Sequence, residues 1–291
     1  MATIHGRAQV QYYEAGIDDS GKVVALRFEA FQNNGAYHQL LTPSISHLTV
    51  FMVPGCYDIQ DISITMNQAF TNTTPTDAYR GAGRPEATHG IERVMDAIAD
   101  DLGMDAAEVR RVNFIKPDQF PYSTSTGLIY DSGDYDTTLD KALELADYAG
   151  FPARKAASEA AGRYRGIGLS TYVEVCGLAP SAVTAAIGIG APGWEHSTVR
   201  LHPTGKATVI TGTSPHGQGH ATSWSQITQT ELGIPFEDVE VIHGDTAFQP
   251  YGLGTYGSRS LAVGGVALYR SLGKVREKAR KMAAHMLEAN V

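Results

Sequence analysis

The sequence predicts an α+β fold with mixed sheets and packed helices. Short segments in which apolar and polar residues alternate indicate strands, and longer segments with apolar residues at three- and four-residue spacing indicate helices. These segments follow one another without the regular strand–helix alternation of a doubly wound sheet. No repeat occurs at a fixed period, so a solenoid or a propeller is not expected.

The chain begins with strand patterns. Residues 8–14 and 22–32 alternate in polarity on either side of the turn-forming residues 18–21, which predicts a hairpin. A third strand is expected over residues 62–66.

Helix signals follow. A helix is expected from Pro85 to Gly103, because Pro suits a first helical turn, Gly ends a helix, and apolar residues recur at helical spacing between them. Asp105 is expected to cap a second helix, with Glu108 completing a capping box.

The middle of the chain reads as a domain boundary. Residues 114–136 are expected to be irregular and residues 137–148 helical, and the stretch over residues 150–162 predicts a linker. The pattern then restarts, with these elements expected in chain order: a strand over 165–175, a hairpin of 197–201 and 207–211, a helix through Trp224 and Leu232, a strand over 239–243 and a helix over 264–288.

The composition describes a mildly acidic globular protein. Its 291 residues include 23 Lys+Arg and 31 Asp+Glu, which gives a net charge of −8 and a pI of about 5.7. An acidic balance without a block of Lys or Arg disfavours a nucleic-acid partner. The length suffices for about two domains.

Location is indicated by cysteine use and by the absence of targeting segments. Cys56 and Cys176 lie far apart, which fits neither a disulfide framework nor a zinc site and favours a reducing, cytoplasmic location. The N-terminal residues lack the apolar core of a signal peptide. Residues 38–57 and 175–194 carry no formal charge, but their prolines and glycines disfavour a membrane span, so no membrane partner is expected.

Glycine is enriched, at 31 of 291 residues, and its most informative occurrences lie in three short loops before predicted helices. We name residues 79–84 loop A, residues 216–220 loop B and residues 254–260 loop C. Such turns let backbone N–H groups approach a ligand, and a helix N-terminus adds unpaired donors. The loops also bring three guanidinium groups that fit phosphate geometry: Arg80, Arg84 and Arg259. They predict an anionic, hydrogen-bonding ligand, with glycines that only build turns and helix ends as the alternative.

Two common phosphate motifs are excluded. Residues 212–217 have the glycine spacing of a P-loop, but Gln218 and Gly219 follow where Lys and then Ser or Thr are required. Loop A lacks the third glycine of a dinucleotide fingerprint, and Pro85 interrupts it.

Side-chain chemistry leaves several alternatives open. His216 and His220 are four residues apart, but the glycines between them disrupt the helix that would let both bind one zinc ion, so polar loop histidines are the other interpretation. No Gly-x-Ser-x-Gly motif or activated Cys provides a nucleophile. Three carboxylates near turns are either general-base candidates or capping and solvated residues: Glu174, Glu195 and Asp245.

Five segments carry a family resemblance. They are residues 78–86 (AYRGAGRPE), 110–115 (RRVNFI), 130–135 (YDSGDY), 216–220 (HGQGH) and 257–260 (GSRS). Through them the chain resembles, over nearly its whole length, the molybdenum-binding large subunits of the xanthine dehydrogenase and carbon monoxide dehydrogenase family. The resemblance implies molybdopterin-binding domains of the aldehyde oxidase and xanthine dehydrogenase type.

The resemblance also implies a cofactor and a reaction. The cofactor is a molybdenum–pyranopterin, usually with a cytosine dinucleotide tail. The reaction hydroxylates a small organic substrate, an aldehyde or an N-heterocycle, with oxygen derived from water. Electrons leave through iron–sulfur and FAD groups, which we expect only on partner subunits. The chain is therefore expected to be a molybdenum-dependent oxidoreductase.

Site residues follow from the resemblance position by position. Tyr79, Arg80 and Gly81 would lie at the catalytic metal, with the backbone of Arg80 and Gly257 beside molybdenum and no side-chain ligand. The residues expected to bind the cofactor lie in or beside the three loops: Arg80, Gly81, Ala82, His216, Gly217, Gln218, Gly219, His220, Thr222, Thr255, Gly257, Ser258, Arg259 and Ser260.

One departure from the family concerns copper. Carbon monoxide dehydrogenases place a copper-binding Cys in the pattern Ala-Tyr-x-Cys-Ser-Phe-Arg, where this chain has Gly81. We therefore expect no copper and no carbon monoxide oxidation.

The second departure is length. Family large subunits are much longer and end in a Gly-x-Gly-Glu whose Glu is the general base, a motif absent from this sequence. Residues 1–150 are expected to form a first molybdopterin-binding domain, incomplete at its N-terminus, and residues 151–291 the start of a second, incomplete at its C-terminus. The expected partners are the remaining large-subunit segments with the general-base Glu, an iron–sulfur subunit and an FAD subunit. The alternatives are a cofactor carrier without turnover and a structural subunit.

Overall fold

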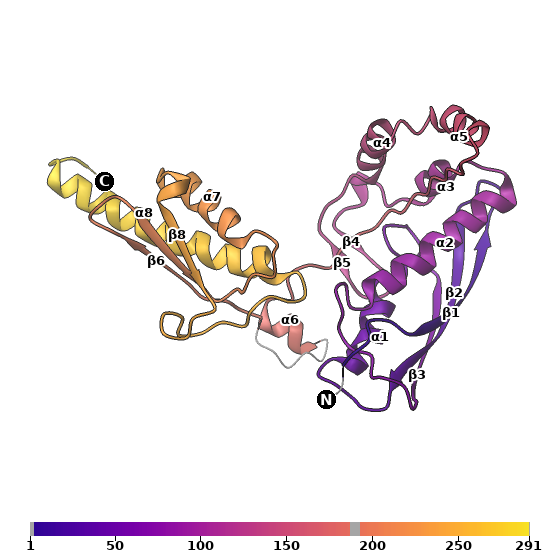
Figure 1. Cartoon of the computed structure of the whole chain (residues 1–291), viewed down its shortest axis with the longest axis horizontal. Coiled ribbons are helices and arrows are strands. Elements are labelled where there is room, and N and C mark those ends of the chain that lie inside the picture. The colour runs from indigo at the N-terminus through magenta and orange to yellow at the C-terminus, as the bar shows by residue number, and fades with distance from the viewer. Residues whose placement is uncertain (1–2, 187–192, 291) are drawn as a thin grey trace. The chain divides into compact units, whose positions relative to one another are not determined.

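The structure is a computed structural model that describes residues 3–186 and 193–290 of the chain. It divides into two compact units, Met1–Glu174 and Val175–Val291, each with a three-stranded sheet and helices (Figure 1). Both units mix parallel and antiparallel strand pairs, which confirms the predicted α+β class.

The division between the units falls later in the chain than the boundary expected at residue 150. The reason is that the segment before Glu174 belongs to the first unit. Leu169 packs against the core of that unit, and the backbone N–H of Thr171 donates to Glu92 at 2.8 Å.

The sheet of the first unit is a hairpin with a third strand added in parallel. β1 (Gln9–Ile17) and β2 (Val23–Gly35) are antiparallel, and β3 (Ile62–Phe70) pairs with β2 on its other side. The turn of the hairpin is fixed by Asp18, whose carboxylate accepts a hydrogen bond from the backbone N–H of Ser20 at 2.8 Å. The predicted hairpin and third strand are confirmed, with each strand longer than predicted.

Helices α1 (Thr42–Phe51) and α2 (Arg84–Leu102) pack against this sheet (Figure 1). As predicted, α2 has Pro85 in its first turn and ends at Gly103, which takes the left-handed conformation with φ of +64°. Helix α1 was not predicted, because the polar and apolar residues of this helix do not separate onto two faces.

The next helix, α3 (Ala106–Asn113), is capped as predicted by Asp105, whose carboxylate accepts a hydrogen bond from the N–H of Ala107 at 2.8 Å. The predicted capping box is wrong, because the carboxylate of Glu108 pairs instead with Arg111 at 3.2 Å.

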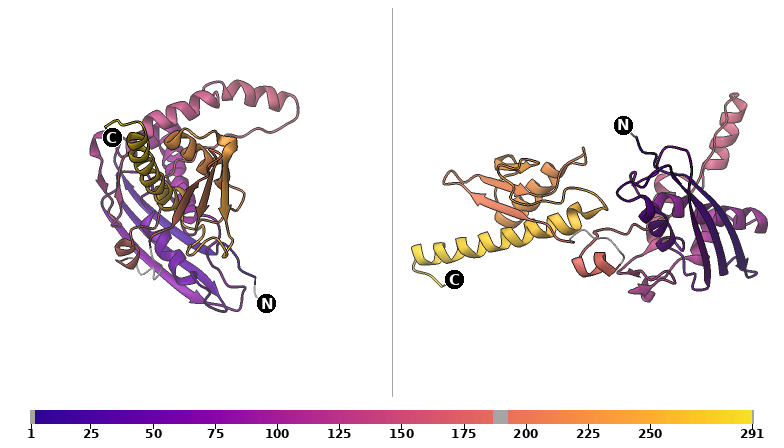
Figure 2. Two further views of the ribbon diagram at one scale, coloured as in Figure 1. Left: turned by 90° about the vertical axis from the view of Figure 1, so that its left-hand side faces the viewer. Right: turned by 90° about the horizontal axis from the view of Figure 1, so that it is seen from below.

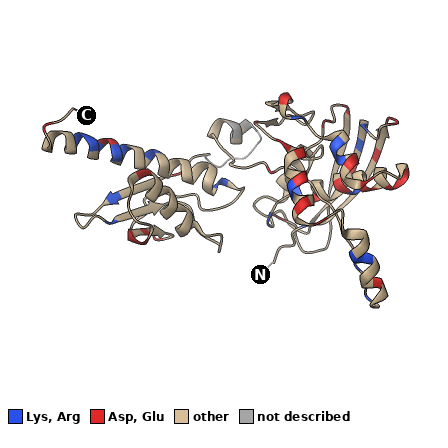
Figure 3. Ribbon diagram, turned by 90° about the horizontal axis from the view of Figure 1, so that it is seen from above, with Lys and Arg blue, Asp and Glu red and all other residues tan. Residues whose placement is uncertain are grey.

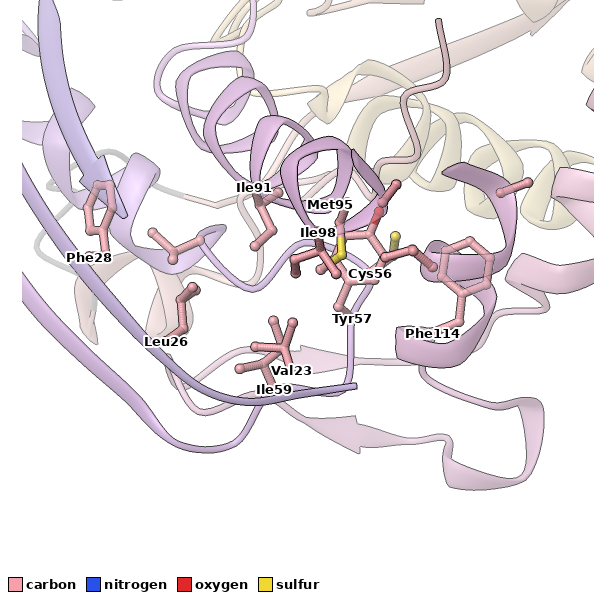
Figure 4. Packing of buried hydrophobic residues seen from close by; sticks show 14 of the residues in the cluster. Val23, Leu26, Phe28, Cys56, Tyr57, Ile59, Ile91, Met95, Ile98 and Phe114 are labelled. Carbon is pink, nitrogen blue, oxygen red and sulfur yellow. The ribbon is translucent and has the colours of Figure 1, made fainter. Parts of the chain in front are cut away.

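The core of the first unit lies between β2 and α2 (Figure 4). Phe28 on β2 and Ile91 and Met95 on α2 are excluded from solvent, and Tyr57 and Phe114 stack with ring centroids 5.7 Å apart. The two outer strands are less buried than β2, since in the described part of the chain each has a neighbour on one side only.

An irregular segment precedes α4 (Tyr135–Leu145), as predicted. It contains the short turn η1 (Pro117–Gln119) and a pair of two-residue strands, β4 (Tyr122–Ser123) and β5 (Ile129–Tyr130). The carboxylate of Asp134 caps α4, which therefore begins before the predicted residue 137.

Two predictions near the end of the first unit are wrong. The predicted linker over residues 150–162 is a helix, α5 (Phe151–Ala160), whose alanine-rich sequence favours this conformation. The predicted strand over residues 165–175 has no regular secondary structure and joins no sheet in the described structure. Side chains of the first unit hold this segment instead: Arg110 donates to the carbonyl of Leu169 at 3.1 Å.

The second unit has the same kind of sheet. β6 (Ser197–Leu201) and β7 (Ala207–Thr211) form the predicted hairpin, and β8 (Val239–His243) pairs in parallel with β7. The predicted helices are present as α7 (His220–Leu232) and α8 (Val266–Met286), which share a hydrophobic core with all three strands. Figure 2 shows that α8 extends well past the end of this sheet.

Three short helices complete the second unit: α6 (Ser181–Ala186), η2 (Phe236–Asp238) and η3 (Ser260–Gly265), a π-helical turn that leads directly into α8. The uncharged stretch over residues 175–194 includes α6, and its residues 187–192 lie outside the described structure. None of the described helices combines the length and the apolarity that a membrane span requires.

Both units share one order of elements: two antiparallel strands, a helix, a third strand parallel to the second, and a long helix. The series β1, β2, α1, β3, α2 corresponds to β6, β7, α7, β8, α8. Loop A, before α2, and loop C, before η3 and α8, therefore hold equivalent places, whereas loop B lies between β7 and α7. The sequence shows no repeat, because strand and helix patterns constrain the period of apolar residues and not their identity.

The last helix is strongly basic. α8 carries six Lys and Arg residues and one Glu, although the net charge of the whole chain is −8. Figure 3 shows the basic residues spread along α8. Four of them recur every three or four residues and share one side of the helix: Arg270, Lys274, Lys278 and Lys281.

Candidate functional site

Loop A is a left-handed turn that leads into α2. Gly81, Ala82 and Gly83 have positive φ angles of +99°, +45° and +89°, and the N–H of Ala82 donates to the carbonyl of Tyr79 at 2.7 Å. Glycine adopts such angles without steric cost. A Cβ at Gly83 would also come within 2.7 Å of the backbone nitrogen of Thr49 on α1. Loop A is therefore fixed both by its own turn and by contact with α1.

Arg7 holds the exposed end of loop A. Its guanidinium donates to the carbonyl of Arg80, lies 5.4 Å from the ring centre of Tyr79 and pairs with Glu86 at 3.5 Å. Tyr79 is 60% exposed, and Arg80 is exposed as well. Tyr79 and Arg80 are therefore the side chains of loop A that a ligand can reach.

Arg84 does not present a guanidinium fork to a ligand, so this part of the sequence interpretation is wrong. Its side chain is only 6% exposed, its Nε lies 3.1 Å from a carboxylate oxygen of Glu174, and its Nη1 donates to the carbonyl of Gly81 at 3.0 Å. Arg84 therefore holds the turn of loop A together from the inside.

Loop B exposes its glycines at the start of α7. Gly217 and Gly219 have φ angles of +94° and +78°, and a Cβ on either would meet no atom within 4 Å. Gly219 is the N-cap of α7, where no side chain caps the helix, so its first N–H groups are available. The side-chain oxygen of Gln218 accepts from the N–H of His216, and Thr222 is exposed in the first turn of α7.

His220, the first residue of α7, is a buried imidazole without a hydrogen-bond partner. The residue is 4% exposed, and neither ring nitrogen is bonded in the described structure. Its ring lies 5.4 Å from that of Trp224. Burial lowers the pKa of His220, and His243 and His216 lower it further. The neutral ring has one donor and one acceptor nitrogen, and leaving both buried without partners is costly unless a ligand completes them.

Loop C is tied down by a buried ion pair. Nη1 of Arg259 lies 2.6 Å from Glu195, and the guanidinium also donates to the carbonyls of Gly254 at 2.9 Å and Trp194 at 2.6 Å. The other oxygen of Glu195 accepts from the N–H of His196 at 2.9 Å. The Arg259 guanidinium is therefore bonded to groups within the protein, and the interpretation that it faces a phosphate is wrong. The prediction that Arg259 contributes to cofactor binding then concerns its backbone alone.

Loop C lies against the segment that leads from β7 into loop B, within the second unit. The N–H of Gly254 donates to the carbonyl of Gly212 at 3.1 Å, and a Cβ at Gly212 would come within 2.7 Å of the Cα of Gly252. Beyond loop C, in η3, Gly264 packs so closely on Thr213 that a Cβ there would overlap the methyl group. Loop C and the segment that leads into loop B are thus in contact within the second unit, while loop A belongs to the first unit.

The remaining predicted residues of loop C surround a second left-handed turn. Gly257 and Ser258 have φ angles of +56° and +53°, and the hydroxyl oxygens of Thr255 and Ser260 lie 3.0 Å apart. This turn presents hydroxyl and backbone groups next to the start of η3.

The three carboxylates considered as general bases are all engaged. Glu174 pairs with Arg84, Glu195 is buried against Arg259, and Asp245 accepts a hydrogen bond from the N–H of Ala247 at 2.8 Å in a turn. In the part of the chain that the structure describes, no group of three or more His, Cys, Asp or Glu side chains is arranged to hold a metal ion.

Known protein families match both the part of the chain with loop A and the part with loops B and C. Two family models, each described as a molybdopterin cofactor-binding domain, match residues 1–114 and 141–291. The chain belongs to the molybdopterin cofactor-binding family. The first model includes loop A and the second includes loops B and C, which confirms the resemblance found in the sequence.

Individual proteins similar to this molybdopterin cofactor-binding chain support the same family. The carbon monoxide dehydrogenase large chain of Hydrogenophaga pseudoflava is 43% identical over 283 residues, which is 95% of this chain and 35% of the relative. Quinoline 2-oxidoreductase from Pseudomonas putida 86 superposes with a TM-score of 0.89 at 32% identity, over 100% of this chain and 37% of that one. A structure of Cu,Mo-CO dehydrogenase superposes with a TM-score of 0.86 at 35% identity, over 99% of this chain and 37% of that one. The molybdopterin cofactor-binding chain thus spans about a third of the length of these relatives.

The second unit fits a molybdopterin cofactor on structural grounds. The pyranopterin of this cofactor carries many hydrogen-bonding edges and an anionic phosphate. Loop B offers open glycines and an uncapped helix N-terminus, and the partnerless nitrogens of His220 lie beside them. Backbone donors, open glycines and a partnerless imidazole therefore occur together at loop B.

Sequence analysis missed the residues that hold the loops. Arg7 stands alone before a strand and shows no pattern that would connect it with Arg80. Glu195 was noted as a carboxylate near a turn, but 64 residues separate it from Arg259. The one available signal was that Glu195 directly follows a long stretch without charge.

Proposed function

We propose that this chain is the cofactor-holding part of the large subunit of a molybdenum hydroxylase, an oxidoreductase that hydroxylates an aldehyde or an N-heterocycle with oxygen from water. Family membership and the names of the relatives, which include a quinoline 2-oxidoreductase, support this proposal. The observation that carries it is loop B, where open glycines, an uncapped helix and a partnerless buried imidazole lie together.

In the second unit, loop B would bind the polar edges of the cofactor. Its N–H donors are those of Gly217, Gly219 and the first turn of α7, where Thr222 adds a hydroxyl. Gln218 and the neutral ring of His220 would supply side-chain hydrogen bonds. When bound, a molybdenum–pyranopterin, proposed here in its cytosine dinucleotide form, supplies the two-electron redox chemistry of the hydroxylation.

Loop C would extend the same binding surface. Its proposed contacts are hydroxyl and backbone groups of residues around the left-handed turn: Thr255, Gly257, Ser258, Arg259 and Ser260. Because Arg259 is held by Glu195, the loop is already in a fixed shape before a ligand arrives, and less conformational entropy is lost on binding.

Loop A would provide the catalytic surface of the first unit. We assign Tyr79, Arg80 and Gly81 to it, with Ala82 contributing its backbone to cofactor binding. The exposed ring of Tyr79 would line the substrate side and exclude water. The backbone at Arg80 and at Gly257 would lie beside molybdenum.

We also propose that the site takes no copper. A side chain at Gly81 would come within 2.6 Å of the Pro85 ring, and the φ of +99° at this position is unfavourable for any residue with a Cβ. Loop A in this shape has no room for the cysteine that the copper pattern requires.

The proposed partners are the rest of the large subunit, including a general-base Glu, an iron–sulfur subunit and an FAD subunit. The support is that the chain spans only 35% of its carbon monoxide dehydrogenase relative. The carboxylates considered as general bases are held in ion pairs or a turn. Without its partners the chain is proposed to be inactive.

The test compares two glycines at the ends of one helix. Gly219 and Gly233 flank α7 with similar φ angles of +78° and +72°, and a Cβ on either meets no atom within 4 Å. Replacing either by Ala should cost about 1 to 2 kcal/mol of backbone strain. Only Gly219→Ala should lower the molybdenum and pterin content of the purified protein, because only Gly219 lies in loop B. Equal content in the two variants would contradict the assignment of loop B.

A cofactor carrier without turnover is the second candidate, since both matching family models are described by cofactor binding and not by an activity. Arg80→Ala in the assembled complex separates the two. A hydroxylase should lose substrate turnover while it retains molybdenum, whereas a carrier should lose only delivery of the cofactor to an acceptor protein.

A further inference from the structure

A buried hydrogen-bond network centres on Glu92 of α2. Its carboxylate accepts from the hydroxyl of Tyr57, from the backbone N–H of Thr171 at 2.8 Å, from the hydroxyl of Thr171 at 3.0 Å and from Nε of Arg110 at 2.9 Å. Tyr57 and Arg110 are fully buried and Glu92 is 5% exposed. Burial raises the pKa of Tyr57 well above its ordinary value, and Cys56 and Glu92 raise it further, so the hydroxyl keeps its proton and donates.

Two of these four hydrogen bonds come from Thr171, which lies in a segment that belongs to no sheet of the described structure. We name residues 168–174 the strap. It joins no strand in the described structure, and its side chains alternate between half-buried and exposed as those of a strand do. Leu169 packs against the main core and Val173 against a second cluster, while Arg110 donates to the carbonyl of Leu169 at 3.1 Å. Thr171, between them, is bonded to Glu92 through both its backbone and its hydroxyl.

The far end of the strap holds loop A. Glu174 lies 3.1 Å from Nε of Arg84, whose Nη1 donates to the carbonyl of Gly81 at 3.0 Å. Thr171 and Glu174 are three residues apart, so the backbone between them can span at most about 10 Å and their contacts are close neighbours along the chain. A shift of the strap at Thr171 is therefore transmitted to Arg84 and from there to the turn of loop A.

Stability alone does not account for this arrangement. A buried group of charges adds little net stability compared with apolar packing, because the charges must first be desolvated. Arg110 already joins α3 to α2 through Glu92 and Asp96, the latter at 2.9 Å. The bonds to Thr171 add a link from these helices to the strap, and through the strap to loop A.

We propose that Glu92 and Thr171 are positioning residues for loop A: they fix the strap so that Glu174 and Arg84 hold the carbonyl of Gly81 and the backbone of loop A in the shape that receives the cofactor. This inference rests on the proposed role of loop A. It assigns a task to residues that touch neither cofactor nor substrate.

The test uses Thr171→Val, which keeps the shape of the side chain and removes its hydroxyl. Hydrogen–deuterium exchange of the purified protein should show the N–H groups of Ala82 and Arg84 exchanging about tenfold faster than in the unmodified protein. Molybdenum content should fall in the same variant. Thr171→Ser, which restores the hydroxyl, should return both measurements toward their original values.

The control is Asn113→Ala. Asn113 is fully buried and bonds to Val23 at 2.8 Å and to Gly21 at 2.9 Å, at the hairpin turn rather than at the strap. This variant should lower thermal stability without speeding exchange in loop A. If Thr171→Val behaves in the same way, or if it loosens loop A while molybdenum content stays unchanged, the positioning role is wrong. An unmodified protein that takes up no molybdenum refutes the proposed function instead, and the exchange measurement still reports whether the strap holds loop A.

Discussion

The guanidinium of Arg259 lies 2.6 Å from the carboxylate of Glu195, and their side chains are 1% and 0% exposed. Removing one partner of a buried ion pair leaves the other charge without compensation, at a typical cost of about 3 to 5 kcal/mol. Glu195→Gln should therefore destabilise the second unit by about that amount, measured by denaturant unfolding.

Glu231→Gln is the matched control for this ion pair. Glu231 pairs with Arg276 at 2.7 Å, but the Arg276 side chain is 51% exposed, so the loss should stay below about 1 kcal/mol. Equal losses in the two variants would show that the Arg259 pair does not organise loop C.

Gly212, which directly follows β7, lies in close contact with the chain at the start of loop C. Gly212→Ala places a Cβ within 2.7 Å of the Cα of Gly252 and in overlap with the carboxylate of Glu195. Overpacking of this kind costs about 1 to 3 kcal/mol, and it should also lower molybdenum content because the start of loop C is displaced.

Gly273→Ala provides the opposite case for comparison with Gly212. Gly273 lies in the middle of α8 and a Cβ there meets no atom within 4 Å, so Ala should stabilise the helix by about 1 kcal/mol. A Gly212→Ala protein as stable and as rich in molybdenum as Gly273→Ala would contradict the close contact between Gly212 and the start of loop C.

The pH dependence of stability should report the burial of His220. Its pKa in the folded state lies below the ordinary value of 6.5, first because of burial and then because of His243 and His216. Below pH 6.5 the unfolded chain takes up a proton that the folded chain does not, so stability falls as the pH decreases through this window. His220→Gln should flatten that part of the curve of unfolding free energy against pH. Curves of equal slope would show that His220 titrates normally.

Copper provides a test of loop A that does not depend on turnover. Gly81→Cys should not create a copper site, because the new side chain meets Pro85 and the backbone has a φ of +99°. Elemental analysis of the purified complex should find molybdenum without stoichiometric copper in both the unmodified and the variant protein. Copper equal to molybdenum in the unmodified protein would refute the proposal.

The fold could be predicted wherever a segment had two distinct faces or a clear end signal. The hairpin of β1 and β2 and the amphipathic α2 with Gly103 at its end are examples. The strap and α1 could not be predicted on the same basis. The strap alternates in burial as a strand does, yet its partners are the side chains of Glu92 and Arg110, which lie far away in sequence.

The candidate site was predictable as a set of loops and not as a set of side-chain roles. Glycines with positive φ in loops A, B and C can be inferred from short motifs, because the constraint on them is local. The roles of Arg84 and Arg259 depend on Glu174 and Glu195, and no local pattern connects these partners. An arginine in a glycine loop therefore predicts an anion site only if no carboxylate of the protein already neutralises it.

The basic surface of α8 has a practical consequence for handling the protein. A charged resin responds to the patch that faces it rather than to the sum over the molecule, since charges beyond about 10 Å are screened at moderate salt. With six Lys and Arg residues and one Glu on this helix, the protein should be retained by a cation exchanger at a pH above its pI of about 5.7. A protein with a negative net charge would then bind to a cation exchanger and elute only as the salt concentration is raised.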